Sequence, residues 1–92
     1  MLVKVMAFAS FREILGRERE LELKAGSTVG DLLDVLASTN RRFKEAAFEE
    51  PGQLREWVLL MINKKRIDPF QDLGAELHEG DEIAILPPVA GG

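Results

Sequence analysis

Residues 27–39 read "STVGDLLDVLAST", and they predict a helix with one apolar face. Aliphatic side chains recur there at the i, i+3, i+4 and i+7 positions that line one side of an α-helix. They are Val29, Leu32, Leu33 and Leu36. Ser27 or Thr28 is the expected N-cap, and Thr28 with Asp31 matches a capping box in which Asp stands for the usual Glu. The rest of the fold must cover this apolar face.

Two strands are predicted before this helix. Residues 2–9 ("LVKVMAFA") carry apolar side chains on both faces, as strands in the middle of a sheet commonly do. Residues 19–26 ("RELELKAG") alternate leucines with charged side chains, which indicates a strand with one solvated face. Between them, residues 10–16 ("SFREILG") have room only for a short helical turn, with Ser10 as its cap and Gly16 at its end. We expect the two strands to pair as antiparallel neighbours.

The second half of the chain predicts another helical segment and three strands. Residues 41–50 ("RRFKEAAFEE") can form the helical segment, which the Pro-Gly pair at 51–52 ends. Residues 55–63 ("REWVLLMIN") are dense in strand-forming residues. A turn and a short edge strand follow in residues 63–67 ("NKKRI"), and residues 82–86 ("EIAIL") form the last strand.

This order of elements indicates an α+β fold, in which a mixed sheet packs on one main helix. The first and last strands are the natural central parallel pair. We expect residues 1–86 to form one domain and residues 87–92 to form an extended C-terminal tail.

The composition limits the functions that the chain can have. With 92 residues there is room for one domain. The formal net charge of −4 argues against a nucleic-acid partner, which needs a basic face. The absence of cysteine excludes disulfides, thiol catalysis and thiolate metal sites. The first apolar run contains Lys4 and is too short for a signal peptide or a membrane span, so we expect a cytoplasmic protein with no membrane contact.

The side chains do not predict a reaction centre. His78 is the only histidine, and a solvated loop residue is its simpler interpretation because no partner for acid–base catalysis can be assigned to it. The acidic pair Glu18 and Glu20 is better explained as a solvated strand face than as a metal site, and residues 49–50 as a helix end. Glycine-rich phosphate loops are missing from the sequence. The main-chain carboxylate of Gly92 remains as a candidate reactive group.

The chain closes with "ILPPVAGG" (residues 85–92). Pro87 and Pro88 stop the last strand, favour an extended polyproline II path and direct the tail away from the sheet. From Pro87 to Gly92 the tail reaches at most roughly 20 Å at ~3.3 Å per residue. Its small residues suit a narrow channel and allow torsions that bulkier residues cannot adopt. Composition alone leaves two interpretations open, a functional tail and a frayed terminus.

These residues resemble the small subunit of molybdopterin synthase (MoaD-like), one of the ubiquitin-like sulfur carriers, which also include the thiamine-pathway carrier (ThiS-like). The closing "PPVAGG", after the "GDEIA" turn and strand (residues 80–84), looks like that family's C-terminus. Residues 3–18 are similar to its opening strand and short helix, residues 26–36 to its main helix, and residues 58–67 to a later strand and turn. The resemblance therefore covers nearly the whole chain.

Two departures from the family accompany this resemblance. "NKKR" (residues 63–66) replaces the common Asn-Gly turn, which puts the geometry of that turn in question. The segment "RRFKEAAFEEPGQLRE" (residues 41–56) has the length of an inserted helix, which would alter a partner surface.

The resemblance implies a β-grasp fold and chemistry on Gly92, with Gly91 beside it. An E1-like adenylating enzyme would activate the carboxylate with ATP and magnesium, and a sulfur donor would convert the acyl adenylate to a thiocarboxylate. The tail would then deliver its sulfur to a pterin precursor in the large molybdopterin synthase subunit, within a heterotetramer. The chain would be the sulfur-carrying subunit and no enzyme by itself, and it would bind no cofactor or metal of its own.

Partner contacts are expected on the tail and on the apolar faces near it. The candidates are Pro87, Pro88, Val89, Ala90, Phe8, Phe11 and Phe70. Core packing is the alternative for each phenylalanine. Other functions stay open: a protein modifier joined through Gly92 to lysines, a sulfur carrier for thiamine or tRNA thiolation, and a binding domain with an inert tail. The proline pair is not typical of the thiamine carriers.

Overall fold

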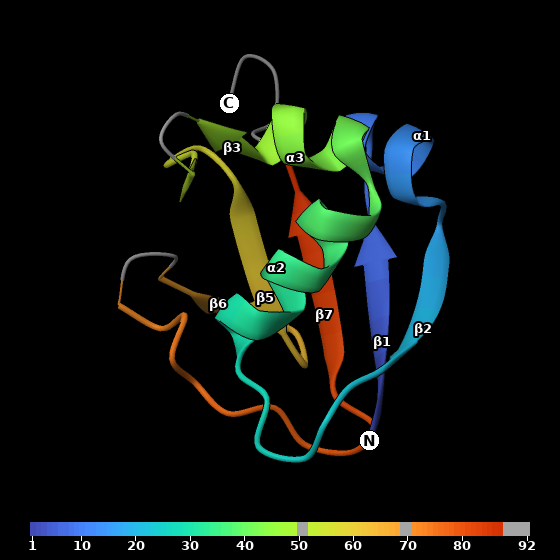
Figure 1. Ribbon diagram of the computed structural model, residues 1–92, viewed down its shortest axis with the longest axis vertical. Coiled ribbons are helices and arrows are strands. Elements are labelled where there is room, and N and C mark those ends of the chain that lie inside the picture. Colours follow the sequence, from blue (N-terminus) through green and yellow to red (C-terminus); the bar gives the residue numbers. More distant parts are fainter. Residues whose placement is uncertain (50–51, 69–70, 88–92) are drawn as a thin grey trace.

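The computed structural model describes residues 1–49, 52–68 and 71–87, and an α+β fold is observed there, as the sequence predicts. Helix α2 lies across one face of a sheet, and α1 and α3 lie at the end where β1 and β7 finish (Figure 1). The elements are β1 (Leu2–Ala7), α1 (Ser10–Leu15), β2 (Glu18–Glu22), α2 (Val29–Thr39), α3 (Arg41–Ala47), β3 (Phe48–Glu49), β4 (Gln53–Leu54), β5 (Leu59–Ile62), β6 (Lys65–Ile67) and β7 (Glu82–Leu86).

The main sheet has five strands in the order β2-β1-β7-β5-β6. β1 and β7 pair in parallel at its centre, whereas β2, β5 and β6 join as antiparallel neighbours. The predicted antiparallel pair and the predicted central parallel pair are both confirmed. Because β1 and β7 run in the same direction, both finish at the same edge of the sheet, and the chain leaves the domain there.

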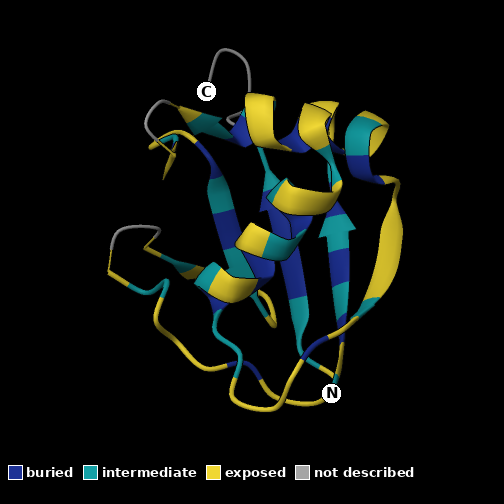
Figure 2. Cartoon of the chain, in the orientation of Figure 1, coloured by how far each residue is buried: buried dark blue, intermediate teal, exposed yellow. Residues whose placement is uncertain are grey.

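Helix α2 and one face of the sheet enclose the core. The four aliphatic residues that predicted the apolar face of α2 are at most 1% exposed. On β1 only alternate side chains are buried, namely Val3, Val5 and Ala7, while Leu2 is 43% exposed. Burial therefore follows the alternation of the strand, and the second apolar face of β1 lies away from the core (Figure 2).

A capping box starts α2, and a side-chain cap starts α3 directly after α2 ends. The Thr28 hydroxyl accepts a hydrogen bond from the Asp31 N–H at 3.2 Å, and the Asp31 carboxylate accepts one from the Thr28 N–H at 2.9 Å. The predicted capping box is confirmed. At the other end, the Asn40 side chain accepts from the Phe43 N–H at 3.0 Å and donates to the Ile14 carbonyl at 3.2 Å. Asn40 thus starts α3 and ties it to α1.

Three local predictions are corrected by the structure. Ser10 is the first residue of α1 rather than its cap, because Ala9 takes that position with a φ of 52° and no side chain caps the helix. The helical segment ends at Ala47 and is followed by a small β3–β4 hairpin. Next to this hairpin, the Arg55 N–H donates to the Ala47 carbonyl at 2.8 Å. The strand expected over residues 55–63 is shorter and covers only β5.

The "NKKR" turn adopts left-handed torsions without a glycine. Asn63 and Lys64 have φ values of 50° and 73°. The Asn63 side chain holds the turn, because it accepts from the Glu82 N–H at 2.9 Å and donates to the Asp81 carboxylate at 2.9 Å. The short edge strand predicted after it is β6. Among the described residues, no helix combines the length and the apolar character that a membrane span requires.

Candidate functional site

The candidate site is the edge of the sheet where β7 releases the chain to its tail. Next to Ile85, the parallel neighbour β1 ends, and the Phe8 N–H donates to the Ile85 carbonyl at 3.2 Å. On the other side, β5 pairs Leu59 with Leu86. Pro87, the last residue before the tail that the structure describes, is half-buried. The tail therefore starts at a point where β7 is bonded on both sides. We call Leu86 and Pro87 the tail root.

Most of the predicted tail site falls beyond the part of the chain that the structure describes. Pro88, Val89, Ala90, Gly91, Gly92 and the anchor candidate Phe70 lie outside the described residues. Their roles stay predictions, as does the boundary between domain and tail. Phe8, Phe11 and Pro87 can be placed.

Phe11 is part of the core. Its side chain is 1% exposed, and its ring centroid lies 5.8 Å from that of Phe43 and 6.1 Å from that of Trp57. A side chain covered on all sides cannot contact a partner directly. The interpretation of Phe11 as a docking anchor is therefore corrected in favour of core packing. Trp57, which covers it, is 40% exposed and was not among the predicted site residues.

Phe8 lies at the surface beside the tail root. It is half-buried, and the guanidinium of Arg12 lies 5.5 Å from its ring centroid, within the range of a cation–π interaction. Arg12 also donates from Nε to the Ala7 carbonyl at 3.3 Å, which holds it over the ring. Sequence reasoning missed Arg12, because Phe8 lies before the start of α1 and no helical spacing relates the two residues.

An apolar strip runs along the sheet face opposite α2 and ends at the tail root. Ile83 and Ile85 belong to the core, so the alternate residues of β7 face the other way. Ala84 is 8% exposed although it is outside the core cluster, and its strand partners are Met6 and Met61. We call this the open-face strip; its residues are Met6, Leu59, Met61, Ala84 and Leu86. The register of the two central strands, combined with alternation, could have predicted it.

The described side chains offer binding surface rather than acid–base machinery. Within the described ranges, no three His, Cys, Asp or Glu side chains gather in a group that could hold a metal ion. The His78 side chain is 74% exposed, and its Nδ1 lies 3.9 Å from the carboxylate of Asp81. This fits the interpretation of His78 as a solvated loop residue.

Comparison with known proteins gives consistent matches over the whole chain. The model of the ThiS family matches residues 5–92. A molybdopterin synthase sulfur carrier subunit from Chlamydomonas reinhardtii is 34% identical, and the alignment covers 100% of both chains. The solution structure of small archaeal modifier protein 1 from Methanosarcina acetivorans is 35% identical, with a TM-score of 0.82 over 99% of this chain and 96% of that one.

A solved complex is also similar to this chain. It contains subunits 1 and 2 of the molybdopterin-converting factor from Helicobacter pylori, and the matching chain is 27% identical. The TM-score is 0.64, with 100% of both chains covered.

Proposed function

The chain belongs to the ThiS family of ubiquitin-like sulfur carriers, and on that basis we propose that it carries sulfur on Gly92 for molybdopterin synthesis. Its fold is the ubiquitin-like β-grasp that the resemblance implied. The observation that carries the proposal is the family match, which runs through residue 92 and therefore includes the Gly-Gly end.

The proposed chemistry uses the C-terminal carboxylate of Gly92. In an E1-like adenylating enzyme, a carboxylate oxygen attacks the α-phosphorus of ATP with magnesium present, and pyrophosphate leaves. Hydrosulfide from the sulfur donor then attacks the acyl carbon, and AMP leaves to give the thiocarboxylate. The large molybdopterin synthase subunit accepts the tail and passes this sulfur to the pterin precursor. Gly91 keeps the tail thin beside these reacting groups.

The geometry of the tail root supports this role. β5 pairs with Leu86, and on the other side of β7 the Phe8 N–H donates to the Ile85 carbonyl, so the tail leaves from a defined point. The open-face strip leads to the same point and offers the apolar contact area that protein interfaces use at their centre. A partner that covers the strip is thereby placed next to the tail. We assign this contact to the large synthase subunit, with Phe8 and Pro87 at its rim, and place the reaction in the cytoplasm.

Intact-mass measurement tests the proposal. The full chain is incubated with a purified E1-like enzyme, ATP, magnesium and a sulfur donor. A carrier gains the mass that accompanies replacement of one oxygen by one sulfur, and a variant lacking Gly92 gains nothing. If the truncated variant still supports dithiolene formation with purified partners, chemistry on Gly92 is ruled out.

A protein modifier is the second candidate, because a similar solved structure is named a small archaeal modifier protein. In this case an isopeptide bond joins Gly92 to a lysine of a target protein, and the same activated tail serves both functions. A lysate reaction with an epitope-tagged chain distinguishes them. High-mass lysine conjugates support the modifier, whereas the sulfur adduct without conjugates supports the carrier.

A further inference from the structure

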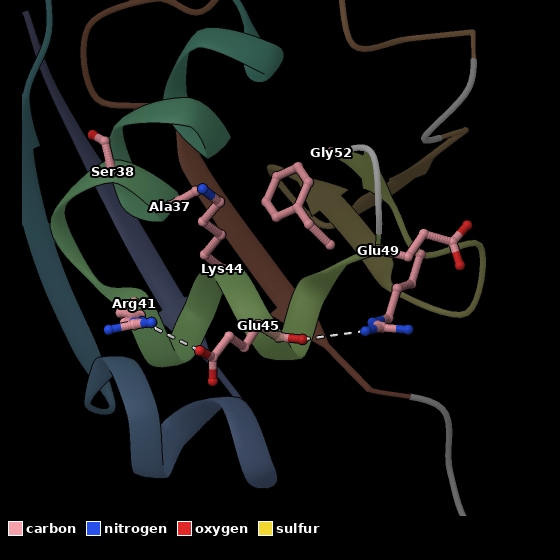
Figure 3. A pocket seen from close by; sticks show the side chains of 9 residues that line it. Ala37, Ser38, Arg41, Lys44, Glu45, Glu49 and Gly52 are labelled. Atoms are coloured by element: carbon pink, nitrogen blue, oxygen red, sulfur yellow. Dashed lines mark hydrogen bonds and ion pairs between the residues drawn. The ribbon is translucent and has the colours of Figure 1, made fainter.

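Two hollows beside α3 form a continuous groove. The larger, of about 780 Å³, is lined by α3, the end of α2 and the β3–β4 hairpin (Figure 3). The smaller, of about 330 Å³, lies between α2 and the same hairpin. Phe48 and Gly52 line both hollows, so the two are adjacent. We call them together the α3 groove; residues of α3, of α2 and of the β3–β4 hairpin line most of it.

One end of the groove is basic. Arg41 pairs with the Glu45 carboxylate at 3.3 Å, and Arg55 donates to the Glu45 carbonyl at 3.3 Å. A guanidinium has five N–H donors, so each arginine keeps donors for a further partner. The side-chain ammonium of Lys44 has no hydrogen bond or ion pair to any residue that the structure describes, and in Figure 3 this side chain points toward Ala37. Three cations and two carboxylates, those of Glu45 and Glu49, therefore line this hollow, which leaves it with one net positive charge on a chain whose net charge is −4.

The other end of the groove is apolar. Leu33 and Leu54, which are 1% and 4% exposed, form its floor, while the half-buried Phe48 and Leu73 form its walls. Asp34 lies exposed at this end. The Asp34 carboxylate would repel an anion, so the two ends of the groove differ in charge. This difference determines which way round an anionic ligand lies. An anionic group is favoured at the α3 end, and an apolar group in the middle.

We propose that the α3 groove binds an extended acidic segment of a partner protein. Carboxylates of that segment pair with Arg41, Lys44 and Arg55, and one apolar side chain packs against Phe48 and Leu73. Charged hydrogen bonds of this kind are stronger than neutral ones. The carboxylates of Glu45 and Glu49 remain in the same hollow and disfavour a polyphosphate backbone, so a peptide fits better than a nucleic acid.

This site is separate from the open-face strip. The groove lies along α2 and α3, whereas the strip is on the sheet face opposite α2 (Figure 1). A protein bound in the groove therefore leaves the strip uncovered. The inference does not depend on what the tail carries, because it concerns a second partner surface.

The test is a titration of the ¹⁵N-labelled full chain followed by NMR. The probe is the acetylated peptide Asp-Asp-Leu-Asp-Glu, compared with Lys-Lys-Leu-Lys-Lys and with a short oligouridine RNA. We expect saturable shifts at the amides of Ser38, Lys44 and Phe48 with the acidic peptide only. Lack of saturable shifts at millimolar peptide, equal binding of the lysine peptide, or tighter binding of the RNA overturns the proposal.

A pair of charge reversals tests the location. Lys44→Glu should weaken the acidic peptide about tenfold, because it removes one attraction and adds one repulsion. Lys24→Glu makes the same charge change at an exposed position outside the groove, and its effect should stay below about twofold. Circular dichroism checks that both variants are folded. Equal loss of affinity in the two variants would show that only net charge matters and would refute the site.

Discussion

Replacing Phe11 by alanine separates the core from the partner surface. Phe11 is 1% exposed and contacts the rings of Phe43 and Trp57, so its removal leaves a cavity that these large neighbours cannot fill. A change of this kind lowers the free energy of unfolding by about 3–5 kcal/mol. For a domain of this size, that corresponds to a fall in Tm of roughly 10–40 °C.

The matched change is Phe8→Ala. Phe8 is half-buried, and its cation–π contact with Arg12 contributes about 0.5–1 kcal/mol at an exposed site. We therefore expect a fall in Tm of only a few degrees. Loss of binding to the large subunit, or slower thiocarboxylate formation, should be the larger effect, because Phe8 borders the tail root.

Thermal melts by circular dichroism measure the fall in Tm of both variants. The binding or activation assay measures the loss of function at 15 °C, where both remain folded. Phe11→Leu, which retains most of the apolar volume, serves as the control for stability. The reasoning is refuted if Phe11→Ala melts within a few degrees of the wild type while losing partner binding, since Phe11 would then act at the surface.

Three further changes test other parts of the structure. Lys64→Gly should raise the free energy of unfolding by about 0.5–1 kcal/mol, because glycine removes the cost of a left-handed torsion but is more flexible when unfolded; an unchanged urea midpoint would contradict this. Thr28→Ala should lower the free energy of unfolding by about 1 kcal/mol, because it removes the capping box. Urea unfolding measures this change, with Ser38→Ala, which lies outside any cap, as the control. Met61→Glu, at a half-buried position of the open-face strip opposite Arg66, should leave the Tm within a few degrees yet weaken binding of the large subunit at least tenfold; unchanged binding would show that the open-face strip is no interface.

Local patterns were sufficient to predict the elements that build the core. The apolar period of α2 and its capping box are properties of neighbouring residues, and both are found in the structure. The central β1/β7 pair was also predictable, because two apolar strands at opposite ends of the chain need a place inside the sheet. Parallel pairing then determines the edge from which the tail leaves.

Features that depend on contacts between distant residues were harder to predict. Phe11 looks the same in sequence as a surface anchor, and only the packing of α1 against Phe43 and Trp57 shows that it is buried. The β3–β4 hairpin forms because the Arg55 N–H reaches the Ala47 carbonyl, a contact that no local pattern reports. The α3 groove exists only because this hairpin folds back along α2.

The position of the open-face strip limits where a partner can carry out chemistry on the tail. β7 supplies Ala84 and Leu86 to the strip and, at its next residue, Pro87 to the tail root. Five residues follow Pro87, and they reach at most roughly 17 Å at ~3.3 Å per residue. Any partner that covers the strip must therefore hold its reacting centre within that distance of the sheet edge. We predict that the proposed adenylating enzyme and the proposed synthase subunit both cover the strip, so that binding of one excludes the other; a stable complex of the chain with both proteins would contradict this.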